Sequence, residues 1–228
     1  IYDPAKSKLE ENGMLPKEMG WYPEKIHDKL DFVLVGLHAK RDNPELLKAQ
    51  ELNIPIYSYP EYAYELCKNK KRVVIAGSHG KTTTTAMILH VLKEMQIDCD
   101  FIIGSGLPGY NSTYSITKDV PLVIFEGDEC CSSALDIKPK FLHYHPHIAV
   151  LTGIAWDHYN LYPTFSSYVD LFKSFSETVA DTLIYNSEDK EVCKIIDTNT
   201  NTDKLKPYHV HEHKVDDNTT YLVHGKLQ

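Results

Sequence analysis

The chain has 228 residues, enough for one large domain or two ordinary ones. Hydrophobic residues make up 42% of it, which excludes a mostly disordered chain, and no apolar run approaches the roughly 20 residues that a membrane-spanning helix needs. The formal charge of −8 argues against a general nucleic-acid-binding protein, while five scattered cysteines and the lack of a signal-peptide pattern fit a cytoplasmic protein.

The first part of the chain alternates helix and strand patterns, which predicts a βαβ unit with parallel strands. Asn43 is a plausible cap for a helix that carries Pro44 in its first turn. We expect residues 1–67 to form one domain and residues 68–228 a second, with the boundary in the polar stretch 67–71. The expected elements are helix 4–13, strand 31–36, helix 43–53, strand 54–60 and helix 61–70.

The second part repeats this rhythm, so the whole chain is predicted to be an α/β protein with a mostly parallel sheet. Ile88, Val91, Leu92 and Met95 recur at helical spacing and are predicted to form the buried stripe of their helix. The tail is predicted to be a polar loop followed by a β-hairpin. The expected elements are strand 73–77, helix 82–95, strands 99–104, 120–129 and 147–158, helix 165–179 and a strand with a turn over 181–189.

A glycine-rich turn joins an apolar strand to a helix that begins with four threonines. Gly77, Gly80, Lys81 and Thr82 give the pattern G-x-x-G-K-T at this turn. Glycines let backbone N–H groups approach a phosphate, and the helix N-terminus adds partial positive charge. The general phosphate-loop pattern would place its first glycine at Ile75, so this loop is shorter. The pattern still predicts a nucleotide-binding loop in preference to a chance turn with a solvated lysine.

Acidic and imidazole side chains follow two other apolar strands. The stretch F-E-G-D-E carries Glu126, Asp128 and Glu129, and the stretch A-W-D-H carries Asp157 and His158. Ligands of open α/β sheets collect at the carboxyl ends of strands, where a carboxylate can hold Mg²⁺. Each stretch alone would also fit a solvated loop or a polar anchor. Three strand ends that meet at one crevice favour a common site.

These motifs resemble those of the ATP-dependent Mur ligases of bacterial cell-wall synthesis. G-S-H-G-K-T-T-T-T, E-G-D-E and the Asp-His pair are similar to the family's G-T-H-G-K-T-T-T-T, E-A-D-E and D-H. The resemblance implies the later part of a Rossmann-like, UDP-binding domain over residues 1–67. It implies the phosphate-loop ATPase domain over residues 68–228, and the family's C-terminal domain is then absent. We therefore expect this piece to be inactive alone.

The resemblance also implies roles for particular residues. ATP and Mg²⁺ are the expected cofactors, with Lys81, Glu126 and His158 as catalytic residues and Thr82, Glu126 and His158 as metal ligands. Some members of the family use a carbamylated lysine, and Lys173 lies in the corresponding helix, but the matching branch does not use one. The expected nucleotide-binding residues are Gly77, Ser78, His79, Gly80, Lys81, Thr82 and Thr83.

The substrates follow from the branch of the family. K-F-L-H-Y-H-P, residues 140–146, is similar to the murein peptide ligases, which join UDP-N-acetylmuramate to the tripeptide L-Ala-γ-D-Glu-meso-diaminopimelate through an acyl phosphate. The L-alanine-adding ligases are the alternative, and a phosphate-loop switch or binding module is an alternative of another class. We expect a peptide or amino-acid amine as partner and no nucleic acid or membrane. Gly36, His38, Asn43 and Gly104 are candidate substrate contacts.

Three histidines alternate at residues 143, 145 and 147. Alternation would place them on one face of a strand, where they could bind a metal. No carboxylate or cysteine is spaced along the sequence to complete a ligand shell, so a solvated edge strand is the favoured interpretation.

Overall fold

A computed structural model describes residues 4–15, 18–198, 201–210, 213–216 and 219–222. The chain divides into two compact units, one of residues 1–58 with 133–135 and one of residues 59–132 with 136–228. The helix at residues 59–67 therefore lies in the second unit, whereas the sequence analysis assigned it to the first domain. The domain boundary itself remains a prediction.

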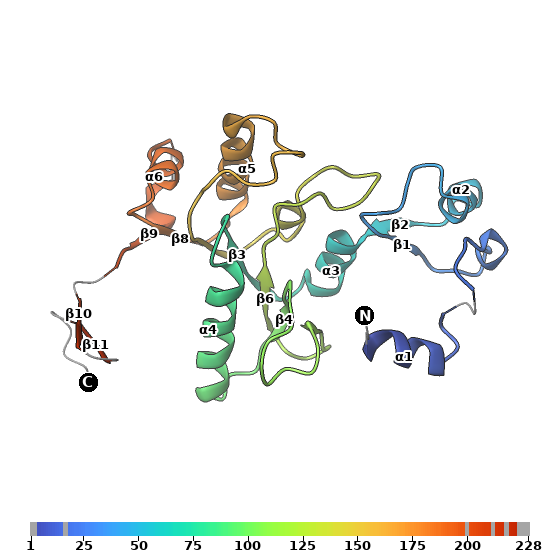
Figure 1. Ribbon diagram of the computed structural model, residues 1–228, viewed down its shortest axis with the longest axis horizontal. Helices are drawn as coiled ribbons and strands as arrows, with labels where there is room; N and C mark the ends of the chain where they lie inside the picture. Colours follow the sequence, from blue (N-terminus) through green and yellow to red (C-terminus); the bar gives the residue numbers. More distant parts are fainter. Residues whose placement is uncertain (1–3, 16–17, 199–200, 211–212, 217–218, 223–228) are drawn as a thin grey trace. The chain divides into compact units, whose positions relative to one another are not determined.

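The first unit contains a short βαβ element (Figure 1). β1 and β2 pair in parallel, and α2 lies between them in the chain. Asn43 caps α2 because its Oδ1 accepts hydrogen bonds from the backbone N–H groups of Glu45 at 2.9 Å and Leu46 at 3.2 Å. The elements of this unit are α1 (Pro4–Glu11), η1 (Pro23–Lys25), β1 (Val33–Val35), α2 (Pro44–Glu51) and β2 (Ile56–Ser58).

The second unit is built on a seven-stranded sheet with the order β5-β4-β6-β3-β7-β8-β9. All pairs in it are parallel except β4 with β5, which confirms the predicted mostly parallel α/β sheet. The strands are β3 (Lys71–Ala76), β4 (Asp100–Ile102), β5 (Tyr114–Ser115), β6 (Leu122–Glu126), β7 (Ile148–Leu151), β8 (Thr182–Asn186) and β9 (Leu205–Tyr208). The helices are α3 (Tyr59–Cys67), α4 (Lys81–Glu94), η2 (Lys140–His143), α5 (Phe165–Thr178), α6 (Lys190–Asp197) and η3 (Thr202–Lys204). The predicted hairpin of the tail is β10 (His213–Asp216) and β11 (Thr219–Leu222), which pair antiparallel.

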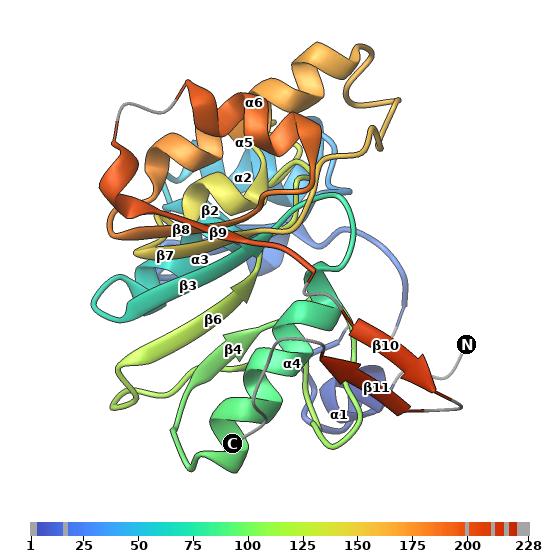
Figure 2. The same cartoon turned by 90° about the vertical axis from the view of Figure 1, so that its left-hand side faces the viewer.

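Helices cover both faces of this sheet (Figures 1 and 2). Successive strand residues point to opposite faces, so Val74 and Ala76 pack in one core and Ile75 in the other. The larger core lies under α5 and α6 and includes Phe172. The smaller core lies under α4, where Leu89 is fully enclosed. Burial on both faces explains why these strands read as continuous apolar runs.

The buried face of α4 differs from the predicted stripe. Thr85 and Leu89 are buried, with Ile88 and Leu92 packed beside them. Val91 is 51% exposed and Met95 is 63% exposed, so the prediction was wrong for these two residues. The spacing of apolar residues could not predict this buried face, because one of its members, Thr85, carries a hydroxyl.

The predicted edge strand of alternating histidines was also wrong. His143 ends the helix η2 and is buried, and His145 has a left-handed backbone with φ of 43°. His147 directly precedes β7 and accepts a hydrogen bond at Nδ1 from the backbone N–H of Arg72 at 3.1 Å.

The strand order places a topological switch point beside β3. The chain leaves β3 through α4 to β4, returns to β6 on one side of β3, and then forms β7 on the other side. Loops that follow neighbouring parallel strands diverge at such a point and leave a crevice at their carboxyl ends. Among the described residues, no helix combines the length and apolar character needed to cross a bilayer.

Candidate functional site

The loop between β3 and α4 is held in a conformation that depends on glycine. Gly77 has φ of 133°, and a Cβ at this position would lie 2.1 Å from Thr152 Oγ1. Gly80 has φ of 79° and forms the N-cap of α4. Thr152 in turn donates from Oγ1 to the carbonyl of His79 at 2.6 Å. The loop therefore packs tightly against the segment that follows β7.

Ser78 fixes this loop from its buried side. Its hydroxyl lies 2.9 Å from the Tyr168 hydroxyl on α5 and accepts a hydrogen bond from the backbone N–H of Ala155 at 2.9 Å. Its own backbone N–H donates to the carbonyl of Gly153 at 2.9 Å. The Ser78 side chain thus connects the loop after β3 to α5 and to the segment after β7. Two other predicted nucleotide-binding residues, His79 and Thr83, have exposed side chains.

Lys81 is the cation of the site, and its partner is Glu129. The Lys81 ammonium donates to Glu129 Oε2 at 2.9 Å and to the carbonyl of Gly77 at 2.7 Å. Glu129 is 1% exposed and also accepts a hydrogen bond from the Tyr168 hydroxyl at 3.2 Å. Burial raises the pKa of Tyr168, so its hydroxyl remains a donor at neutral pH. The sequence analysis named Glu129 only as one carboxylate of the E-G-D-E stretch and chose Glu126 as a catalytic residue.

Thr82 and Glu126 form a second contact between the same two strand ends. Thr82 donates from Oγ1 to Glu126 Oε1 at 2.7 Å. Glu126 Oε2 accepts a hydrogen bond from the backbone N–H of Gly104 at 2.9 Å, and a Cβ on Gly104 would lie 3.0 Å from Oε1. Gly104 therefore orients the Glu126 carboxylate, a contact that the sequence analysis did not foresee.

His158 lies on the other side of Glu129. Its Nε2 is 3.4 Å from Glu129 Oε1, and its backbone has φ of 53°. Glu129, Asp157 and His158 each offer a ligand atom within 4.8 Å of the others. Burial and nearby Asp128 raise the pKa of the neighbouring Cys130 thiol to about 12, so Cys130 stays neutral. Glu129 thus links Lys81 to His158, and Glu126 joins the same loop through Thr82, the residue after Lys81.

The donor set and the loop geometry suit a magnesium–nucleotide complex. A threonine hydroxyl and the carboxylates of Glu126, Glu129 and Asp157 supply the oxygen ligands that Mg²⁺ prefers. The first N–H groups of α4 have no acceptor within the helix and carry the positive end of its dipole. The residues present therefore fit ATP and Mg²⁺.

The other predicted substrate contacts lie in the first unit. Gly36, His38 and Asn43 line a cavity of about 350 Å³ together with Trp21 and Leu46. Asn43 uses its side-chain oxygen to cap α2, so its observed role is structural. Lys173, which the resemblance raised as a possible carbamylated lysine, is exposed on α5.

Comparison with known proteins gives consistent matches. Residues 75–225 match the family described as Mur ligase middle domain. A UDP-N-acetylmuramate–L-alanine ligase of Desulfitobacterium hafniense is 31% identical over 153 residues, which cover 67% of this chain and 32% of the relative. The UDP-N-acetylmuramate–L-alanyl-γ-D-glutamyl-meso-2,6-diaminoheptandioate ligase of Haemophilus influenzae is 29% identical over 198 residues, which cover 85% of this chain and 43% of the relative.

Two solved structures show the same fold. The UDP-N-acetylmuramate:L-alanyl-γ-D-glutamyl-meso-diaminopimelate ligase of Neisseria meningitides matches with a TM-score of 0.81 and 22% identity. The match covers 96% of this chain and 75% of the Neisseria chain. The UDP-N-acetylmuramate–alanine ligase of Thermotoga maritima matches with a TM-score of 0.64 and 24% identity over 83% of this chain and 42% of its own. The chain spans about a third of the length of the first curated relatives it matches.

Proposed function

Since the chain belongs to the Mur ligase middle-domain family, we propose that it is the ATP-binding part of a ligase that joins UDP-N-acetylmuramate to the tripeptide L-Ala-γ-D-Glu-meso-diaminopimelate. The observation that supports this most is the meeting of three strand ends at Glu129. This buried carboxylate contacts Lys81 from the loop after β3 and lies beside His158 from the segment after β7.

Different residues of the chain bind the phosphates and the metal ions that activate a carboxylate. When bound, MgATP supplies the phosphoryl group that turns the sugar's carboxylate into an acyl phosphate open to attack by an amine. Lys81 and the N–H groups at the start of α4 bind phosphate oxygens. Thr82 and Glu126 would hold one Mg²⁺ ion, and His158 with Asp157 would hold a second. Gly104 keeps the Glu126 carboxylate oriented.

Electrostatics explain why the site needs several cations. Two like charges about 4 Å apart repel by about 4 kcal/mol at an effective dielectric near 20. A carboxylate that approaches a triphosphate meets several such repulsions, which Lys81 and the metal ions offset. Glu129 keeps the Lys81 ammonium against the loop through a 2.9 Å ion pair, so the cation is in position before the nucleotide arrives.

The tripeptide is proposed as the acceptor on the strength of residues 140–146. Their sequence K-F-L-H-Y-H-P is similar to the murein peptide ligases. The L-alanine ligases are the second candidate, because relatives with that name are 30–34% identical to this chain. An amide-forming assay of the longer ligase, with L-alanine and the tripeptide offered in competition, decides between them. We expect preference for the tripeptide, and preference for L-alanine would overturn this choice of acceptor.

Binding by the 228-residue chain tests the family function without the complete reaction. We expect UDP-N-acetylmuramate and MgATP each to raise the melting temperature, because a ligand that binds only the folded state stabilises it. A shift with MgATP but none with the sugar nucleotide, in a sample shown to be folded, would favour a phosphate-loop switch module. No shift with either ligand would contradict the proposed function.

A further inference from the structure

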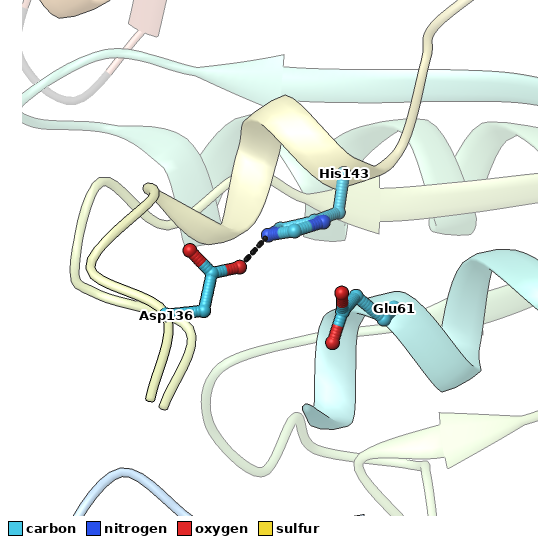
Figure 3. A group of neighbouring side chains, drawn as sticks. All are labelled: Glu61, Asp136 and His143. Carbon is cyan, nitrogen blue, oxygen red and sulfur yellow. Dashed lines mark ion pairs between the residues drawn. The ribbon is translucent and has the colours of Figure 1, made fainter. Parts of the chain in front are cut away.

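A second group of metal-ligating side chains lies away from the proposed nucleotide site. Glu61 on α3, Asp136 on the loop before η2 and His143 at the end of η2 each offer one ligand atom within 4.8 Å of the others. All three belong to the second compact unit. Figure 3 shows the edge of the His143 imidazole directed at Asp136, with the Glu61 carboxylate beside the ring. None of the residues assigned to ATP, Mg²⁺ or the sugar belongs to this group.

His143 is buried without a hydrogen-bond partner for its Nε2. The residue is 8% exposed. Nε2 lies 2.9 Å from Asp136 Oδ2 as a close contact with a carboxylate, but it has no partner with hydrogen-bond geometry. A buried polar atom left in this state keeps its desolvation cost without the gain of a hydrogen bond. The geometry is therefore unfavourable for the protein alone.

The same geometry suits a metal ion. Ligand atoms about 2.0–2.1 Å from a common ion lie roughly 2.9–3.4 Å apart for angles of roughly 90–110° at the ion, and the distance from Nε2 to Oδ2 is 2.9 Å. Burial and the charge of Lys138 lower the pKa of His143 against the opposing effect of Asp136 and Glu61. A histidine binds a metal ion through the lone pair of its neutral imidazole.

Asp136 is oriented by the backbone around it. Its Oδ1 accepts a hydrogen bond from the backbone N–H of Lys138 at 2.9 Å, which directs Oδ2 toward His143. Hydrogen bonds to the non-coordinating oxygen commonly fix carboxylate ligands in metal sites. The two carboxylates also offset the charge of a divalent cation.

We propose that Glu61, Asp136 and His143 form a binding site for a divalent transition-metal ion of the zinc class. One imidazole and two carboxylates form a ligand set typical of Zn²⁺, and water completes the shell. An imidazole and two carboxylates with no phosphate oxygens beside them favour an ion of the zinc class over Mg²⁺ and Ca²⁺, which take mostly oxygen ligands. A bound ion would tie α3 to η2 and to the loop before it.

The test is a Zn²⁺ titration of the 228-residue chain against a chromophoric chelator. We compare the wild type with His143→Gln, Glu61→Gln and a matched control, His145→Gln, whose ring packs against Tyr64 at 4.9 Å outside the cluster. A His158→Gln variant identifies any ion bound at the nucleotide site. We expect a Zn²⁺ site whose affinity falls about tenfold or more in His143→Gln and Glu61→Gln and is kept in the other two variants.

Zn²⁺ should also raise the melting temperature of the wild type and of His145→Gln but not of Glu61→Gln. Glu61 is only partly buried, so Glu61→Gln decides the outcome if His143→Gln does not fold. The proposal is overturned if the wild type binds no Zn²⁺ at micromolar concentration, if Glu61→Gln keeps the wild-type affinity, or if binding is lost only in His158→Gln. These outcomes are independent of whether the chain binds ATP.

Discussion

Gly77 is the residue whose replacement tests the loop geometry most directly. In Gly77→Ala the new Cβ would meet Thr152 Oγ1 at 2.1 Å, on a backbone with φ of 133°. Left-handed strain and overpacking together should lower the free energy of unfolding by at least about 2 kcal/mol. The loop should also lose MgATP affinity. Chemical denaturation and a nucleotide titration measure the two effects.

Gly80→Ala is the matched control for this prediction. Gly80 has φ of 79°, but no atom lies within 4 Å of a Cβ placed there. Its replacement should therefore cost only the backbone strain, about 1–2 kcal/mol. Equal losses in the two variants would show that the packing against Thr152 does not matter.

Asp128 should make stability depend on pH. Burial alone would raise its pKa, but hydrogen bonds from the Lys140 ammonium at 2.6 Å and the Cys130 N–H outweigh this and hold the pKa below the ordinary 3.8. The charged form is thus favoured by folding, so the stabilisation is present above pH 3.8 and is lost as the pH falls through the folded-state pKa.

The corresponding measurement is the unfolding free energy of wild type and Asp128→Asn across pH. The pair is partly exposed, so we expect the variant to be less stable by up to about 1 kcal/mol at pH 7, with the difference narrowing below about pH 4. A difference that stays constant down to pH 2 would exclude the Asp128 charge as its cause.

Residue spacing could predict some of the site but not its centre. Lys81, Thr82 and Glu126 follow directly from their strand ends, and the structure brings them together. Glu129 could not be separated from Asp128 and Glu126 in the same acidic stretch. Its position depends on Tyr168, which comes from α5, 39 residues along the chain. A contact of that kind leaves no local pattern in the sequence.

At the level of elements, a buried ion pair joins the start of β3 to β4. The Lys70 ammonium donates to Asp100 Oδ2 at 2.7 Å and to the carbonyls of Thr117 and Val120. Lys70 is 7% exposed and Asp100 is 1% exposed. Asp100→Ala would leave a buried, uncompensated cation, so we expect a loss of about 3–5 kcal/mol in unfolding free energy.

An exposed pair on a helix provides the comparison. Glu51→Ala removes the partner of Lys48 on the surface of α2, and it should change stability by less than about 1 kcal/mol. Equilibrium denaturation of both variants gives the two values. If Asp100→Ala lowered the free energy of unfolding no more than Glu51→Ala, the buried Lys70–Asp100 pair would not stabilise the contact between these strands.

The sequence predicted most elements, and the ones it missed have identifiable causes. α6 is short, but its signals were present, since Asp189 caps it and Val192, Ile195 and Ile196 recur at helical spacing. β9 contains a proline, which argues against a strand except at a sheet edge, where β9 lies. The histidines at 143, 145 and 147 alternate by coincidence, because η2 ends and the backbone turns among them.

At the scale of the whole chain, the α/β class and the mostly parallel sheet were predicted correctly from the strand–helix rhythm. The chain forms two compact units, and the first contains the predicted βαβ element. A UDP-binding role for that unit remains a prediction. Strand order could not be predicted, because the position of β6 between β4 and β3 depends on pairing between distant segments.

The central claim is that Lys81, the acidic strand end and His158 together bind one magnesium–triphosphate group. Titration of MgATP into wild type and Lys81→Met tests it most directly, with Lys93→Met at the far end of α4 as control. Loss of a charge-assisted hydrogen bond costs about 1.5–3 kcal/mol, so Lys81→Met should bind MgATP about tenfold or more weakly while circular dichroism shows a folded chain. Lys93→Met should bind it like the wild type. Wild-type affinity in a folded Lys81→Met would contradict the account.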